Sequence, residues 1–119
     1  MQVSVIVPFL NEEAYIEQCL QALLQQRFPR DAYEIICVDN GSHDRSADIV
    51  RRYPDVILLG ETRRGSYAAR NRGMVLARGE RLAFTDADCA PADDWLMRID
   101  QSLNRPGAAL VLGRRLFPA

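Results

Sequence analysis

The stretch Arg81-Leu-Ala-Phe-Thr-Asp86-Ala-Asp88-Cys89 runs from an apolar, strand-like segment into two aspartates separated by one small residue, and Pro91 follows shortly after. Residues two apart on a strand face the same side, so extension through Asp88 would direct both carboxylates one way. Two such charges repel unless a cation or a hydrogen-bond donor lies between them. The stretch predicts either a site for a metal-bound nucleoside diphosphate, or a solvated turn in which Asp88 caps the next helix.

Composition indicates one soluble, globular domain. The chain has 119 residues, 48% of them hydrophobic and 26% charged, and a net charge of −1. These values fit a folded domain and give no overall basic character that would favour a nucleic-acid partner. All 15 basic residues are arginine. The absence of lysine excludes a Walker A lysine, a Schiff base and a lysine acid or base.

The cysteines and the N-terminus bear on location. The three cysteines have no metal-ligand spacing; Cys19 and Cys37 are expected to be small buried hydrophobes, while Cys89 lies beside the aspartates. An odd number of cysteines without a secretion signal favours a reducing compartment. The N-terminal apolar run is too short to span a membrane and has no basic flank. We therefore expect a cytoplasmic protein with no membrane segment in this chain, whose full-length form acts in the cytoplasm or at the cytoplasmic face of a membrane.

Strand and helix patterns alternate along the chain. Buried β-branched or apolar runs predict strands at residues 3–7, 33–38, 55–59, 81–88 and 108–112, with Pro8 ending the first. Helical spacing and capping residues predict helices from Asn11 to near Arg27, from about Asp44 to Pro54, from Ser66 to Gly79 and from about Asp93 to Leu103.

This alternation predicts an α/β fold: a doubly wound, mostly parallel sheet with helices on both faces. Ligands of such sheets bind outside the carboxyl ends of the strands, where the strand order reverses. With the order 3-2-1-4, residues 8–12 would lie between Asp39 and the pair formed by Asp86 and Asp88. Three polar strand ends would then meet in one crevice.

Two aspartates near the second strand have competing interpretations. Asp39 can accept hydrogen bonds from a ring N–H or a ribose hydroxyl, or it can close a turn with Gly41 and Ser42; the sequence leaves both open. Asp44 fits a helix N-cap better than a ligand contact. His43, the only histidine, receives no functional role.

Arginine and glycine residues follow the third strand. Arg70, near the N-terminal end of its predicted helix, is suited to a phosphate, whereas Arg63 and Arg64 fit a solvated loop. Gly65 and Gly73 are expected to permit a backbone turn and a close helix–sheet contact. No G-x-G-x-x-G follows the first strand, which argues against a dinucleotide oxidoreductase.

Four sequence blocks together resemble the family 2 glycosyltransferases, inverting enzymes of the GT-A fold. The blocks are Val3-Ser-Val-Ile-Val-Pro8 with Asn11-Glu12; Ile36-Cys-Val-Asp39-Asn-Gly-Ser42 with Asp44; Gly65 with Ala69-Arg70-Asn71-x-Gly73; and Gly79-Glu-Arg-Leu-Ala-Phe-Thr-Asp86-Ala-Asp88. Each block is weak alone, but they follow the family's order and spacing across nearly the whole chain.

The resemblance implies a role for each matching residue. Pro8, Leu10 and Glu12 would cradle the base, Asp39 would bind the uracil or guanine edge, Arg70 would lie near the phosphates, Asp86 would bind the ribose, and Asp86 with Asp88 would hold Mn²⁺ or Mg²⁺. Leu10 departs from the aromatic residue that often stacks on the base in this family, so the stacking contribution is lost here.

The resemblance also implies an activity and a boundary. It covers the nucleotide-sugar-binding half, residues 1–119, of an enzyme that transfers sugar from a UDP- or GDP-sugar to an acceptor hydroxyl on a lipid carrier, a polysaccharide or a protein. The acceptor-binding half and its catalytic base are expected beyond Ala119. We therefore expect donor and metal binding, no catalytic residue in this chain and no transfer by these residues alone. Exposed sheet edge near the C-terminus is expected to favour self-association.

Two other functions remain as alternatives. A nucleotidyltransferase that makes the sugar nucleotide would share the fold, but it would carry a glycine-rich loop with arginine and lysine where residues 8–12 stand. A receiver-like signalling domain also places aspartates at strand ends. It would need acidic residues at the end of the first strand, where this sequence has Pro8-Phe9 with Glu12 and Glu13 close by. It would also need a lysine at the end of a later strand, and the sequence has no lysine.

Overall fold

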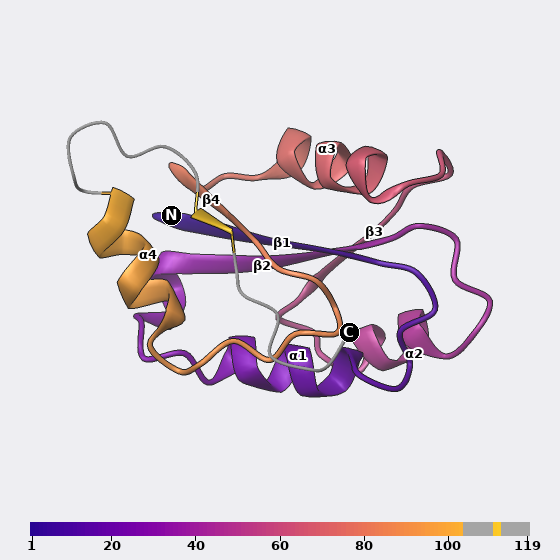
Figure 1. Ribbon diagram of the computed structural model, residues 1–119, viewed down its shortest axis with the longest axis horizontal. Helices are drawn as coiled ribbons and strands as arrows, with labels where there is room; N and C mark the ends of the chain where they lie inside the picture. Colours follow the sequence, from indigo (N-terminus) through magenta and orange to yellow (C-terminus); the bar gives the residue numbers. More distant parts are fainter. Residues whose placement is uncertain (104–110, 113–119) are drawn as a thin grey trace.

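The fold is a parallel sheet between helices, seen in a computed structural model that describes residues 1–103 and 111–112. Its elements are β1 (Val3–Phe9), α1 (Ile16–Leu24), the 3₁₀ turn η1 (Arg30–Ala32), β2 (Tyr33–Asp39), α2 (Ser46–Arg51), β3 (Ile57–Gly60), α3 (Ser66–Leu76), β4 (Arg81–Phe84), α4 (Trp95–Leu103) and β5 (Val111–Leu112). The strands pair in parallel in the order β3-β2-β1-β4-β5 (Figure 1). The predicted doubly wound sheet and the order 3-2-1-4 are confirmed.

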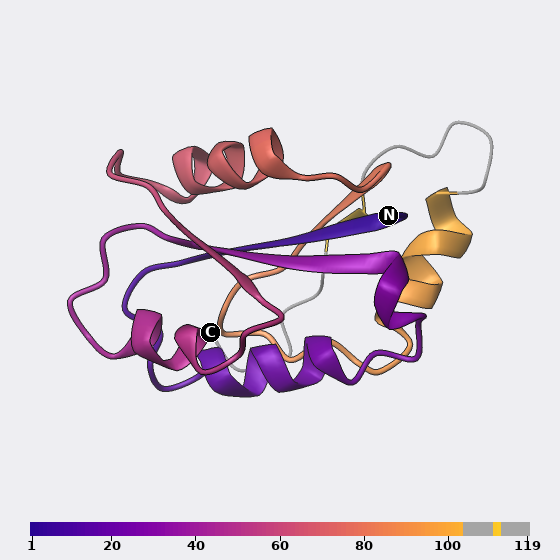
Figure 2. The same ribbon diagram turned by 180° about the vertical axis from the view of Figure 1, so that it is seen from behind.

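Helices cover both faces of the sheet. In both views α3 lies on one face, and α1 and α2 lie on the other (Figures 1 and 2). Alternate residues of a strand face opposite sides, and two separate apolar clusters follow from this. The larger contains Val5 and Val7 of β1 with Leu20 and Leu23 of α1. The smaller contains Ile36 and Val38 of β2 with Ala69 of α3.

Two glycines have the roles that the sequence predicts. A Cβ at Gly73 would lie 2.7 Å from Cγ2 of Ile6, so its absence lets α3 pack closely on β1. Gly65 has a φ of +113°, a conformation that side-chain-bearing residues rarely adopt. Gly65 therefore turns the chain into α3.

Pro8 does not end the first strand, as the sequence suggested; β1 continues to Phe9. The backbone N–H of Thr85 donates to the carbonyl of Ile6, so Ile6 directs its backbone groups toward β4. Pro8, two residues on, faces the same side, where β4 has already ended at Phe84. The missing N–H of proline therefore costs no ladder hydrogen bond.

The predicted start of the first helix at Asn11 is wrong. Helix α1 begins at Ile16 and ends at Leu24, short of the expected Arg27. Asn11 adopts a left-handed conformation with a φ of 52°, and its side-chain oxygen accepts a hydrogen bond from the backbone N–H of His43 at 2.8 Å. A contact with a residue far along the chain has replaced the local cap.

The predicted caps of α3 are also wrong. Gly65 occupies the N-cap position, and Ser66 is the first helical residue. At the other end α3 stops at Leu76, and Gly79 has no left-handed φ. Gly79 instead passes close to β1: its N–H donates to Oγ of Ser4 at 2.8 Å, and a Cβ there would lie 2.5 Å from the backbone nitrogen of Ser4.

Replacing Gly79 by alanine is expected to lower the free energy of unfolding by about 1–3 kcal/mol, because the new Cβ would overlap backbone atoms that cannot rotate away. Chemical denaturation measures this loss. Gly60→Ala is the matched control, since a Cβ there meets nothing within 4 Å and should leave stability nearly unchanged. Equal stabilities for the two variants would contradict the close approach at Gly79.

The remaining boundaries lie within a few residues of those predicted. Strand β2 gains Asp39, and β3 is shifted to Ile57–Gly60. Helix α2 begins at Ser46, α4 begins at Trp95, and β5 comprises Val111–Leu112; the rest of the strand predicted at 108–112 lies outside the described residues. Cys19 and Cys37 are buried as expected. Within the described part of the chain, no helix is long and apolar enough to cross a membrane.

Candidate functional site

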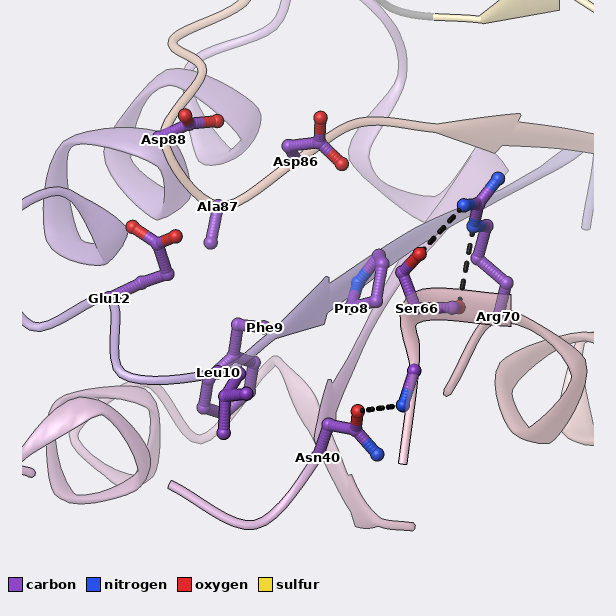
Figure 3. Close-up of a pocket in the computed structure, with 11 residues that line it drawn as sticks. Pro8, Phe9, Leu10, Glu12, Asn40, Ser66, Arg70, Asp86, Ala87 and Asp88 are labelled. Carbon is purple, nitrogen blue, oxygen red and sulfur yellow. Dashed lines mark hydrogen bonds between the residues drawn. The ribbon is translucent and has the colours of Figure 1, made fainter. Parts of the chain in front are cut away.

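A pocket of about 430 Å³ opens at the carboxyl ends of β1, β2 and β4. It is lined by Pro8, Phe9, Leu10, Glu12, Asn40, Gly65, Ser66, Arg70, Asp86, Ala87 and Asp88. Figure 3 shows the acidic side chains of Asp86, Asp88 and Glu12 on one part of its wall, and Ser66 and Arg70 on another. The pocket lies where the order of a doubly wound sheet reverses, the usual position of a ligand site in such folds.

The two aspartates are brought together by a turn rather than by a strand. Strand β4 ends at Phe84, so the predicted extension through Asp88 is wrong. The N–H of Cys89 donates to the carbonyl of Asp86 at 3.0 Å and closes the turn. Carboxylate oxygens of Asp86 and Asp88 and the sulfur of Cys89 nevertheless lie within 4.8 Å of one another. Helix α4 begins only at Trp95, so Asp88 does not occupy its N-cap.

Two buried thiols, those of Cys19 and Cys89, contact this turn. The thiol of Cys19 on α1 lies 3.7 Å from the carbonyl oxygen of Asp86, and the thiol of Cys89 lies 3.7 Å from Oδ1 of Asp88. Burial is the main cause that raises the pKa of Cys19 well above its ordinary value, and it raises the pKa of Cys37 to about 12. Cys19 therefore stays protonated at neutral pH and can donate to the Asp86 carbonyl.

Arg70 is oriented by the first turn of its own helix. Its Nη2 donates to Oγ of Ser66 at 2.9 Å, and its Nε donates to the Ser66 carbonyl at 3.4 Å (Figure 3). A guanidinium has five N–H donors, and these two bonds use only part of that capacity. The side chain can thus present further donors and a positive charge to an anion in the pocket.

Leu10 and Glu12 stand on a loop that is tied to the loop after β2. The backbone N–H of Asn11 donates to Oγ of Ser42 at 2.9 Å, and that of Glu12 donates to Oγ of Ser46 at 2.7 Å. These bonds join positions 31 and 34 residues apart. The pocket wall formed by Leu10 and Glu12 is therefore set by the fold and not by the local sequence.

The predicted N-cap at Asp44 is wrong: Arg45 occupies the N-cap position of α2 without a side-chain cap hydrogen bond, and Asp44 precedes it. Asp44 instead ties the start of α2 to the loop after β1. Its Oδ1 accepts hydrogen bonds from the N–H and the hydroxyl of Ser46 at the start of α2, and its Oδ2 accepts one from the N–H of Glu13. Partial burial would raise the pKa of the Asp44 carboxyl, but these hydrogen bonds outweigh it and hold the pKa below its ordinary value. Asp44 is not among the residues that line the pocket.

Asp39 stands apart from the other predicted site residues. Pro8, Leu10, Glu12, Arg70, Asp86 and Asp88 all line the pocket, whereas Asp39 does not. Its Oδ1 accepts a hydrogen bond from the N–H of Ser42 at 2.8 Å, the turn that the sequence offered as one of two interpretations. Base recognition by Asp39 stays a prediction.

Five residues that line the pocket have no site role predicted from the sequence: Phe9, Asn40, Gly65, Ser66 and Ala87. Among them, Asn40 forms side-chain hydrogen bonds with the loop between β3 and α3. The available signal was its position: it directly follows a buried strand whose end was already expected at the ligand edge. The arginines of that loop, Arg63 and Arg64, are exposed and do not line the pocket.

Comparisons with known proteins agree on one family. The family model described as glycosyl transferase family 2 matches residues 4–118. Glycosyltransferase AglE of Haloferax volcanii is 41% identical over 120 residues, which cover 97% of this chain and 40% of that protein. The poly(ribitol-phosphate) beta-glucosyltransferase of Bacillus spizizenii is 36% identical over 104 residues, covering 82% of this chain and 16% of that protein. The chain thus spans less than half the length of these curated relatives.

Solved structures give the same result. The mannosyltransferase PcManGT of Pyrobaculum calidifontis, solved with GDP-Man and Mn²⁺, is 40% identical with a TM-score of 0.82, covering 88% of this chain and 33% of that one. S. aureus TarS 1–349, solved with UDP, is 30% identical with a TM-score of 0.81, covering 87% of this chain and 32% of that one. The family model covers nearly the whole chain, and the solved structures share its fold, so this chain belongs to glycosyl transferase family 2.

Proposed function

We propose that this chain binds a UDP- or GDP-sugar together with Mn²⁺ or Mg²⁺ and forms the donor-binding part of an inverting glycosyltransferase. The observation that carries the proposal is the pocket at the strand ends, which combines the carboxylates of Asp86 and Asp88 with the guanidinium of Arg70. A nucleoside diphosphate bound with a divalent cation needs both kinds of group, since the cation binds carboxylates and the phosphates bind donors.

The acidic residues fit a hard divalent cation. Asp86 and Asp88 offer carboxylate oxygens close enough to share one ion, and Mg²⁺ and Mn²⁺ prefer such oxygens to sulfur. The buried thiol of Cys89 lies against Oδ1 of Asp88, where we assign it to orienting the carboxylate. When bound, the cation would neutralise charge on the leaving diphosphate.

The other walls fit the remainder of the donor. Arg70 is assigned to the phosphates and Asp86 also to the ribose. Pro8, Leu10 and Glu12 are assigned to the base, and Leu10, which is 50% exposed, offers an apolar surface to a ring face. We assign the base edge to Asp39, whose Oδ1 already holds the turn at Ser42.

The activity of the whole protein is part of the proposal. Inverting transfer needs a general base on the face of the sugar opposite the leaving group, and no residue of the described pocket is assigned that role. The acceptor is a hydroxyl of a lipid carrier, a polysaccharide or a protein. Family membership favours this function over a nucleotidyltransferase or a receiver-like domain.

Calorimetric titration tests the donor site directly. We expect UDP or GDP, and the corresponding sugar conjugates, to bind in MnCl₂, with one of the two bases bound more tightly than the other. The same ligands should bind more weakly in EDTA. Uridine and guanosine serve as controls that lack the diphosphate and should show little dependence on Mn²⁺. If no nucleoside diphosphate binds in the presence of either Mn²⁺ or Mg²⁺, the proposed function is wrong.

A further inference from the structure

The side chain of Asn40 ties the end of β2 to the loop between β3 and α3. Its Nδ2 donates to the carbonyl of Arg63 at 2.6 Å and to that of Glu61 at 3.2 Å. Its Oδ1 accepts a hydrogen bond from the N–H of Gly65 at 2.8 Å. One side-chain amide thus binds three backbone groups of a single loop, which lie 21 to 25 residues further along the chain.

These contacts leave Asn40 little capacity to recognise a ligand itself. A primary amide has two donor hydrogens, and both are used by loop carbonyls. The carbonyl oxygen retains only acceptor capacity, which does not suit an anionic diphosphate. The residue lines the pocket, but its polar atoms face the loop, as the dashed contact in Figure 3 illustrates.

The loop that Asn40 holds leads directly to the cationic wall of the pocket. Gly65, with its φ of +113°, is followed by Ser66, the first residue of α3. The hydroxyl and carbonyl of Ser66 in turn accept the hydrogen bonds that orient Arg70. A continuous series of contacts therefore runs from the Asn40 amide through Gly65 and Ser66 to the guanidinium.

We propose that Asn40 is a positioning residue: by holding the β3–α3 loop it sets the place of Ser66 and Arg70 against the diphosphate of the donor. This inference rests on the nucleoside-diphosphate site proposed above. It assigns Asn40 no direct contact with the ligand, and it predicts that the contribution of Asn40 to binding depends on the presence of Arg70.

A second amide in the chain provides a matched control. Nε2 of Gln26 donates to the carbonyls of Ala22 and Ala92, and its Oε1 accepts from the N–H of Leu96. Gln26 thus also joins two segments through three backbone hydrogen bonds, but it does not line the pocket. Removing it tests whether the loss of such an amide weakens ligand binding merely by loosening the fold.

The experiment is a double-mutant cycle on the full chain, read by calorimetry with MnCl₂ and whichever of UDP and GDP the wild type binds more tightly. Asn40→Ala is expected to weaken binding about tenfold, which corresponds to roughly one or two neutral hydrogen bonds. In the Arg70→Ala background the same substitution should cost less than about twofold, because the group that Asn40 positions is gone. Gln26→Ala should lower the melting temperature yet keep the affinity within about twofold.

Each result bears on a defined claim. Equal losses for Asn40→Ala with and without Arg70 would overturn the inference, and so would an equal loss for Gln26→Ala. Gly65→Ala, which disturbs the same loop without changing Asn40, should reproduce the loss and its dependence on Arg70; unchanged affinity there would count against the inference. A wild type that binds neither UDP nor GDP refutes the proposed function itself, and the inference with it.

Discussion

Replacing Asp88 by asparagine is expected to remove most of the Mn²⁺-dependent affinity for a nucleoside diphosphate. Asparagine keeps the size of the side chain but removes its charge, and an amide oxygen is a weaker ligand for a hard cation. Removing a residue that merely orients a metal ligand lowers metal affinity by about 10–100-fold. Loss of a direct carboxylate ligand should therefore cost at least about 100-fold, measured by titrating UDP or GDP in MnCl₂.

The same variant should behave differently without metal. In EDTA the carboxylates of Asp86 and Asp88 face an anionic diphosphate, so removing one charge relieves repulsion. Asp88→Asn should then bind as well as wild type or up to a few-fold more tightly. Asp93→Asn is the matched control, because it removes an exposed carboxylate that does not line the pocket. An equal loss of affinity in EDTA and in MnCl₂ would contradict the assignment of Asp88 to the metal.

Replacing Glu34 by glutamine is expected to destabilise the fold by about 3 kcal/mol, since hydrogen bonds to a charged acceptor contribute about 1.5–3 kcal/mol each. Glu34 is only 5% exposed. Its Oε2 accepts from the hydroxyl of Ser4 at 2.6 Å and from the N–H of Arg78 at 2.7 Å, and its Oε1 accepts from Nε of Arg78 at 3.1 Å. Either orientation of a glutamine amide would turn donors toward donors. Of the three hydrogen bonds, the one from the exposed guanidinium of Arg78 contributes least to stability, because solvent screens it.

The effect of Glu34 should depend on pH in a defined direction. Burial by itself would raise the pKa of this carboxyl, but the hydrogen bonds from Ser4 and Arg78 outweigh it and lower the pKa below its ordinary value. Because the pKa of Glu34 is lower in the folded state than in the unfolded chain, the ionised carboxyl stabilises the fold. This stabilisation is complete above the pKa that Glu34 has in the unfolded chain, and it is lost as the pH falls through the pKa that Glu34 has in the folded state. The stability difference between wild type and Glu34→Gln should thus stay constant from pH 7 to about 5 and narrow below about pH 4.5.

Thermal and urea unfolding between pH 3 and 7 measure this difference. The melting temperature of Glu34→Gln should fall by roughly 10 °C at pH 7. Glu80→Gln provides a matched control at an exposed glutamate, where the change should stay within about 0.5 kcal/mol. If the stability difference between Glu34→Gln and wild type is the same at every pH from 3 to 7, the Glu34 carboxylate does not supply this stability.

Some features of the site follow from short-range patterns. The β-branched run at β1 and the apolar run at β2 predict buried strands, and their alternation with helical spacing leads to the parallel sheet and its order. Because parallel strands end at one edge, the sequence also places Asp86, Asp88 and Arg70 near the same edge. These features depend on residue type and on spacings of two to four residues, which are read along the chain.

Other features depend on partners far apart in the sequence. Pro8 remains in a central strand only because β4 ends before it, and Gly79 is required by the backbone at Ser4, 75 residues away. The carboxylates of Asp86 and Asp88 meet through a turn and not through strand alternation.

The sequence by itself therefore determined the fold class, the family and the edge of the sheet at which the pocket lies. Only the tertiary structure decided that Asn40 and not Asp39 lines the pocket, and that Asn11 leaves the helix to bind the loop after β2. The physical reason is that polar side chains bond to whichever backbone groups packing leaves unpaired. Which groups those are depends on contacts between segments that no local periodicity records.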